Sequence, residues 1–178
     1  EHGKICDDYR IKKSQPTIQY LLDKNCKIIL CSHLGRPKGP DDKSCSLEPC
    51  AERLGKLLDK KVQFVTDCVG EQVETDAREL KNGEILLLEN LRFHKEEEAN
   101  DDEFAKKLAS LAEVFVQDGF GVVHRAHAST DAVARHLPSV AGMLIEKEVD
   151  TITNVIDNPK KPLMAIIGGA KISDKIEI

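Results

Sequence analysis

The chain lacks tryptophan, and aromatic residues make up only 4% of its 178 residues. Hydrophobic residues nevertheless reach 40%. A chain of this length can bury one sizeable core and has room for the edge of a second domain. We therefore expect a core built from Ile, Leu, Val and Ala side chains.

Long apolar runs are also lacking, since no stretch of about 18 apolar residues occurs, and we expect no membrane span. We also expect no signal peptide at its start. Its formal net charge is -5, which argues against a general nucleic-acid-binding surface, although a local basic pocket remains compatible with it. These absences favour a cytoplasmic protein without a membrane or nucleic-acid partner.

Cysteine is present without the Cys-x-x-Cys spacing of many metal and redox sites. The six cysteines are Cys6, Cys26, Cys31, Cys45, Cys50 and Cys68. A chain with an aliphatic core of this size does not need disulfide bonds. Reduced thiols are the favoured interpretation, and disulfides or a metal site stay open as alternatives.

Apolar runs of strand length alternate with amphipathic stretches of helix length. We expect strands at 27–32, 62–66, 84–89, 114–118 and 163–167, and helices at 16–24, 47–58, 71–80, 101–112 and 146–157. Pro16 suits the first turn of the first helix, and Asn100 or Asp101 suits the cap of the fourth. The strands are nearly uniformly apolar, which is typical of a parallel sheet with helices on both faces. The residues thus predict an α/β fold with one five-stranded parallel sheet, incomplete at both ends.

The charged run at residues 95–98, KEEE, is interpreted as solvated surface.

Basic residues and glycines follow four of the five expected strands. They are His33, Gly35, Arg36, Arg92, His124, Arg125 and the segment 168–175. In open parallel sheets, ligands bind outside the carboxyl ends of the strands, and guanidinium groups bind phosphate and carboxylate through paired hydrogen bonds. The pattern predicts a site for a small anion that carries both groups. Taken singly, Arg92 is typical of a surface arginine and Gly35 of a turn.

The segment GGAK at residues 168–171 is a second candidate for an anion site, because glycines let backbone N–H groups approach a phosphate at a helix N-terminus. Lys171 and Lys175 lie four residues apart, on one face of a helix. The spacing of a Walker A motif is lacking, and so is Gly-x-Gly-x-x-Gly. The second absence argues against a nicotinamide-dependent oxidoreductase.

Four motifs in order resemble the phosphoglycerate kinase family: SHLGRP at 32–37, LLLENLRFHKEEE at 86–98, HRAHAS at 124–129 and GGAKISDKI at 168–176. The resemblance implies two Rossmann-like domains. Residues 1–142 would form the phosphoglycerate-binding domain without its first strand, 143–159 the interdomain helix and hinge, and 160–178 the first strand and start of the nucleotide-binding domain. The strand at 163–167 would then belong to that second domain.

The same resemblance implies the activity: reversible phosphoryl transfer in glycolysis between 1,3-bisphosphoglycerate and ADP, giving 3-phosphoglycerate and ATP. Mg-ATP or Mg-ADP would bind mostly outside this chain, no residue here would ligate the metal, and the fragment alone would be inactive. The family is usually monomeric. A non-catalytic anion-binding module is the alternative.

By motif match, the residues implied for substrate binding are Arg10, His33, Gly35, Arg36, Arg92, His124 and Arg125. Arg10 and Lys171 are implied as catalytic. The residues implied for the nucleotide are Gly169, Ala170, Lys171, Asp174 and Lys175.

Overall fold

The computed structural model describes residues 5–164 and residue 166. The chain divides into two compact units, Glu1–Glu146 and Lys147–Ile178. The first unit holds all the strands described below, and helix α6 begins in it and ends in the second.

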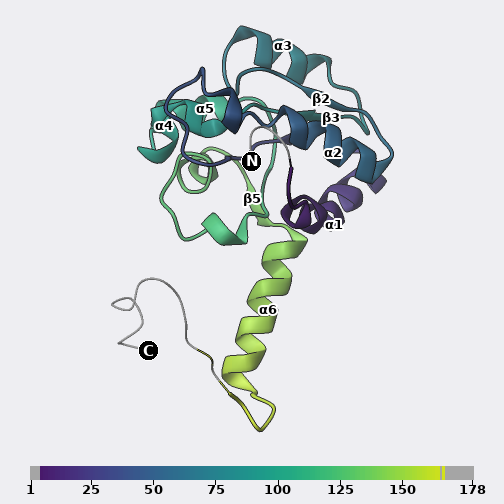
Figure 1. Ribbon diagram of the computed structural model, residues 1–178, viewed down its shortest axis with the longest axis vertical. Helices are drawn as coiled ribbons and strands as arrows, with labels where there is room; N and C mark the ends of the chain where they lie inside the picture. The colour runs from purple at the N-terminus through teal and green to yellow at the C-terminus, as the bar shows by residue number, and fades with distance from the viewer. Residues whose placement is uncertain (1–4, 165, 167–178) are drawn as a thin grey trace. The chain divides into compact units, whose positions relative to one another are not determined.

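Helices and strands alternate through the first unit (Figure 1). The helices are α1 (Tyr9–Asp23), α2 (Glu48–Leu58), α3 (Glu71–Glu79), α4 (Lys95–Glu98), α5 (Asp102–Ala109) and α6 (Met143–Asp157). The strands are β1 (Ile28–Leu30), β2 (Val62–Phe64), β3 (Ile85–Leu87), β4 (Phe115–Gln117) and β5 (Ser139–Ala141). Short 3-10 helices lie at η1 (Lys43–Cys45), η2 (Leu91–Phe93), η3 (Phe120–Val122) and η4 (Ala132–Arg135).

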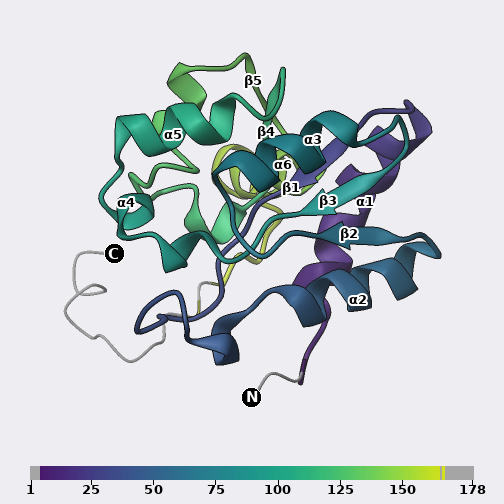
Figure 2. The ribbon, with the colours of Figure 1, turned by 90° about the horizontal axis from the view of Figure 1, so that it is seen from above.

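The strand β3 lies between β1 and β2 in a three-stranded parallel sheet. Its side chains alternate between the two faces of the sheet: Ile85 packs with Ile18 of α1 and Leu54 of α2, whereas Leu86 packs in a cluster with residues of α3 and α5. Leu87 packs against Ala51 of α2. Figure 2 shows α2 and α3 on opposite faces of this sheet. Because both faces are covered, every residue of β3 is buried, which confirms the predicted α/β fold with parallel strands and helices on both faces.

The prediction of a single sheet is wrong, because β4 pairs with β5 in a separate two-stranded parallel sheet. The sequence pattern missed β5 since all three of its residues are exposed and form no apolar run. A strand was expected at residues 163–167 instead. Leu163, Met164 and Ile166 have no strand structure, and residues 165 and 167 lie outside the described part of the chain.

Two helix starts also differ from expectation. Helix α1 begins at Tyr9 and contains Pro16 in its interior, so the interpretation of Pro16 as a first-turn residue is wrong. The helix continues across the proline because Ile11 extends the apolar stripe that packs on the same core as Ile18. Helix α6 begins at Met143 rather than at residue 146. In α5 the cap is Asp101, whose side chain accepts a hydrogen bond from the N–H of Phe104 at 2.8 Å.

The interpretation of residues 95–98 as solvated surface is wrong for Glu97, which is 2% exposed in α4. Its carboxylate is buried because both oxygens accept hydrogen bonds from Ser129. Within the described ranges, no helix has the length and apolar content needed to cross a membrane.

Candidate anion-binding site

The carboxyl ends of β1 and β3 place the loop after β1 beside the turn after β3. Asn90, in that turn, is fully buried at 0% exposure and joins the two segments. Its side-chain oxygen accepts from the N–H of Leu34 at 3.2 Å and of Arg92 at 3.1 Å. Its amide nitrogen donates to the carbonyls of Leu34 and Cys45, both at 2.8 Å. Both polar atoms of the side chain are thus used to hold the loops that carry His33, Arg36 and Arg92.

Arg92 adds a second link between the same two segments. Its Nη1 donates to the carbonyl of Gly35 at 2.7 Å, and its Nε lies 2.9 Å from Oε1 of Glu98. That Nε–H is not aimed well enough at the carboxylate to form a hydrogen bond, so the contact is an ion pair. Gly35 has a φ of +64°, a backbone conformation that glycine adopts at no steric cost. The guanidinium is therefore held at the rim by the loop after β1 and by α4.

The pKa of His33 reflects the positive charges near this rim. Burial is the largest cause that lowers the pKa of His33 from 6.5 to about 4. The positive charges that lower it further belong to Arg92, Arg125, His127 and Arg10. A cation is disfavoured at His33 because other cations already surround it. Charged residues from α1, from the turn after β3 and from the loop after η3 therefore all lower the pKa of His33.

The loop that carries Arg125 and His127 is held by Thr130 and Glu97. The hydroxyl of Thr130 donates to the carbonyl of Arg125 at 2.6 Å and accepts from the N–H of His127 at 3.2 Å. The N–H of Ala128 donates to the carbonyl of Glu97 at 2.9 Å. The loop is thus tied to α4, which directly follows the turn of Arg92.

The buried carboxylate of Glu89 also holds the turn after β3 in place. Glu89, at the carboxyl end of that strand, accepts hydrogen bonds from the N–H of Asn90 at 2.7 Å and of Leu47 at 2.8 Å. It also accepts from the hydroxyl of Ser46 at 2.7 Å. Because Leu47 is the residue before α2, Glu89 joins the start of that helix to the turn of Asn90.

The predicted site residues fall into three groups. Arg10, Arg92 and Arg125 act together on His33. Arg36 and His124 are exposed and are not among the charges that act on His33. The residues predicted for the nucleotide, together with the catalytic lysine, lie outside the described residues: Gly169, Ala170, Lys171, Asp174 and Lys175.

Sequence reasoning assigned no site role to three residues that the structure brings into this region: His127, Asn90 and Glu97. Asn90 carried a usable signal, because it directly follows the expected strand at 84–89, at the end where ligand-binding loops begin. Glu97 carried none, since its neighbours in the acidic run are chemically identical and only the fold distinguishes them.

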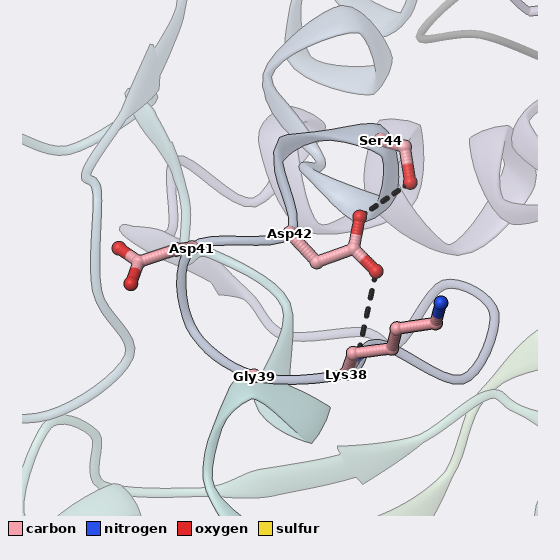
Figure 3. Close-up of a pocket in the computed structure, with 5 residues that line it drawn as sticks. All are labelled: Lys38, Gly39, Asp41, Asp42 and Ser44. Carbon is pink, nitrogen blue, oxygen red and sulfur yellow. Dashed lines mark hydrogen bonds between the residues drawn. The ribbon is translucent and has the colours of Figure 1, made fainter.

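A separate hollow of about 500 Å³ lies further along the same loop and is lined by Lys38, Gly39, Asp41, Asp42 and Ser44 (Figure 3). The side chain of Asp42 accepts from the N–H of Lys38 and from the hydroxyl of Ser44. Two carboxylates oppose an anionic ligand at this hollow, so we assign the candidate site to the rim around His33.

One group of possible metal ligands occurs among residues 5–164: Asp67, Cys68 and His94, with donor atoms within 4.8 Å of one another. Cys68 is 1% exposed and packs in the apolar core, and burial raises the pKa of its thiol. His94 Nε2 already lies 2.7 Å from Asp67 Oδ1. A thiol must lose its proton to ligate a metal, so this group is better explained as core packing beside a surface ion pair.

The parallel sheets and the arginine-bearing loops at their carboxyl ends define the class of this protein: an α/β protein with a basic rim. The family model described as phosphoglycerate kinase matches residues 1–178. The chain belongs to the phosphoglycerate kinase family.

Similar proteins agree over nearly the whole chain. Phosphoglycerate kinase of Dictyoglomus turgidum is 54% identical over 178 residues, which are 100% of this chain and 45% of that protein. The cytosolic phosphoglycerate kinase of Triticum aestivum is 57% identical over 176 residues, 98% of this chain and 44% of that protein. The crystal structure of phosphoglycerate kinase from Pyrococcus horikoshii OT3 aligns with a TM-score of 0.88 at 33% identity, covering 98% of this chain and 44% of that one. The chain therefore spans less than half the length of these relatives.

Proposed function

We propose that the protein containing this chain is a phosphoglycerate kinase, which transfers a phosphoryl group reversibly between 1,3-bisphosphoglycerate and ADP. In this proposal, the described residues supply the site for 3-phosphoglycerate or 1,3-bisphosphoglycerate. One observation supports the assignment beyond family membership: Asn90 and Arg92 join the loop of His33 to the turn after β3. There, burial first and then the charges of Arg92, Arg125, His127 and Arg10 lower the pKa of His33. A ligand with a phosphate and a carboxylate suits such a cluster, because it brings several negative charges in a small volume.

The chemistry needs fixed positive charge more than acid–base catalysis. The acceptor carboxylate of 3-phosphoglycerate is already ionised at neutral pH, so no base has to activate it. The obstacle is repulsion between anions, which preorganised cations offset as charge develops in the transition state. Arg36, Arg92, His124 and Arg125 bind the substrate in this scheme, with His33 and Gly35 beside them. Arg10 additionally stabilises the transferring phosphoryl group.

The nucleotide half of the reaction is assigned by motif alone. Mg²⁺ enters with ADP or ATP as part of that substrate, and no residue of this chain is proposed as its ligand. Gly169, Ala170, Asp174 and Lys175 contact the nucleotide, and Lys171 acts as the second catalytic cation. Because most of the nucleotide site is proposed to lie elsewhere in the protein, the isolated chain binds substrate without turning it over. Turnover of 3-phosphoglycerate and Mg-ATP by the isolated chain would contradict this.

A cytoplasmic monomer is the proposed setting, with no nucleic-acid or membrane partner. The wheat relative is described as cytosolic, which supports this location, whereas a chloroplastic relative from Volvox carteri is 54% identical over 175 residues.

The substitution Arg36→Ala in the full-length protein tests the substrate assignment. We expect its dissociation constant for 3-phosphoglycerate, measured by isothermal titration calorimetry, to rise at least about tenfold, because a charge-assisted hydrogen bond contributes roughly 1.5–3 kcal/mol. Binding of Mg-ATP should change much less. The matched control is Arg78→Ala, since the guanidinium of this exposed arginine bonds within its own helix α3. Equal weakening of both ligands by Arg36→Ala would show the assignment to be wrong.

A further inference from the structure

Two consecutive glutamates of α4 hold two different parts of the basic rim. Glu98 is exposed, and its Oε1 lies 2.9 Å from Nε of Arg92. Glu97 is buried and contacts the loop of Arg125 and His127 on the other side. In an α-helix, neighbouring side chains lie about 100° apart around the axis. Successive residues of α4 can therefore contact two separate loops.

The contacts of Glu97 are specific and strong. Its Oε1 accepts from the hydroxyl of Ser129 at 2.6 Å, and its Oε2 accepts from the N–H of the same residue at 3.0 Å. Oε1 also lies 3.8 Å from Nδ1 of His127. The backbone carbonyl of Glu97 adds the bond from Ala128, which is itself 0% exposed.

A buried carboxylate is costly unless hydrogen bonds and opposite charge compensate it. Here the compensating contacts come from the loop 125–129, which carries Arg125 and His127. Glutamine has nearly the same shape as glutamate, but its NH₂ group cannot accept a hydrogen bond. Replacing Glu97 by Gln therefore removes the negative charge that strengthens both bonds to Ser129 and forces the hydroxyl of Ser129 to accept a hydrogen bond instead of donating one. It also removes the carboxylate that lies 3.8 Å from Nδ1 of His127, and it does so without opening a cavity.

We propose that Glu97 is a positioning residue of the phosphoglycerate site. Its carboxylate fixes the loop 125–129 against the turn of Arg92 and so sets the separation of the Arg92 and Arg125 guanidinium groups. The inference rests on the proposed function, because that separation matters only if one small anion bridges the two arginines.

The test is Glu97→Gln in the full-length protein, assayed with both substrates in the direction of ATP consumption. We expect the KM for 3-phosphoglycerate and its dissociation constant to rise about tenfold. The KM for Mg-ATP should stay within about twofold. A residue that only stabilises the fold would lower the melting temperature without separating the two substrates in this way.

The matched control is Glu96→Gln, the same change one residue earlier on α4, where the side chain is half-buried. It should leave both KM values unchanged. Ser129→Ala removes only the hydroxyl that donates to Glu97 and should raise the KM for 3-phosphoglycerate about threefold. Combined with Glu97→Gln it should add less than the product of the single effects, because both changes break the same contact.

The outcomes separate this inference from the proposed function. If the unsubstituted protein fails to bind 3-phosphoglycerate, the proposed function is wrong. If it binds, but Glu97→Gln leaves the KM for 3-phosphoglycerate within twofold or raises both KM values equally, the positioning role is wrong. Should Glu97→Gln fail to fold, Ser129→Ala decides the question by the same criterion.

Discussion

Two stretches of the loop after β1 are held in different ways. Residues 33–36 are joined to the turn after β3 by the buried side chain of Asn90 and by Arg92. Residues 38–44 form an exposed turn whose hydrogen bonds, from Lys38 and Ser44 to Asp42, run within the turn itself. The first stretch carries the basic residues of the candidate site, and the second lines the open hollow of Figure 3.

The difference shows what makes a loop suitable for binding a small anion. A hollow in a surface turn offers space, but the hydrogen bonds of Asp42 there run only within the turn and do not tie its side chains to the strand ends. A loop bonded to buried polar atoms behind a strand end holds its side chains at fixed separations, which preorganised binding requires. The following substitutions test whether this contrast in attachment has the expected energetic consequences.

Breaking the attachment at its centre should have the largest effect. Asn90→Ala leaves partly buried backbone groups of Leu34, Cys45 and Arg92 without their hydrogen bonds to this side chain. Each unsatisfied group costs roughly 1–3 kcal/mol, and we expect the free energy of unfolding, measured with urea, to fall by about 3–5 kcal/mol. Asn82→Ala, at an exposed asparagine, is the control and should change it little. A loss below about 1 kcal/mol for Asn90→Ala would contradict the proposed role of the Asn90 side chain in joining the two loops.

The second largest difference between residues 33–36 and residues 38–44 should be in the pH dependence of stability. Because the folded pKa of His33 is lowered to about 4, the unfolded chain takes up this proton first as the pH falls below 6.5. Stability is therefore lost between pH 6.5 and 4, and the loss is complete below pH 4. His33 is half-exposed, so solvent screening reduces the full effect to about 1.5 kcal/mol.

His33→Asn should flatten the unfolding free energy between pH 6.5 and 4, measured by urea titrations at several pH values. Asp42 provides the comparison in the exposed turn. The hydrogen bond from Ser44, and then that from the N–H of Lys38, lower the pKa of its carboxyl below 3.8, so its contribution is present above that pH and lost as the pH falls further. Asp42→Asn should leave the slope between pH 6.5 and 4 unchanged. An unaltered slope in His33→Asn would mean that His33 is not the responsible group.

A pair of glycine substitutions gives the smallest contrast. Gly35 has a φ of +64°, and a Cβ there would lie 3.1 Å from Sγ of Cys45. Gly35→Ala should lower the free energy of unfolding by about 1 kcal/mol, because an L side chain is strained at positive φ. At Gly39 a Cβ would meet nothing within 4 Å, and Gly39→Ala should stay within about 0.5 kcal/mol. Thermal melting of both variants checks this, and equal losses would remove the distinction between the stretches.

The strands β1 to β4 lie where the apolar runs predicted them. The signal is clearest for β3, because a strand covered on both faces must be apolar at nearly every position. The start of α1 and the existence of β5 were not predictable in this way. A proline inside a helix is tolerated only when packing on both sides compensates, and an exposed strand leaves no apolar pattern. The basic side chains of the rim could be proposed from their positions after strands, but the residues that hold them could not.

Residue types and their order by themselves determined the α/β class, the places of apolar strands such as β3, and the family. Tertiary structure alone decided that Asn90 and Glu97 are buried and which loops they join. The physical reason is that a polar side chain has no fixed preference for burial: it is buried only where partners distant in the chain satisfy its hydrogen bonds. For Glu97 those partners lie more than thirty residues away, in a loop that only the folded chain brings to α4.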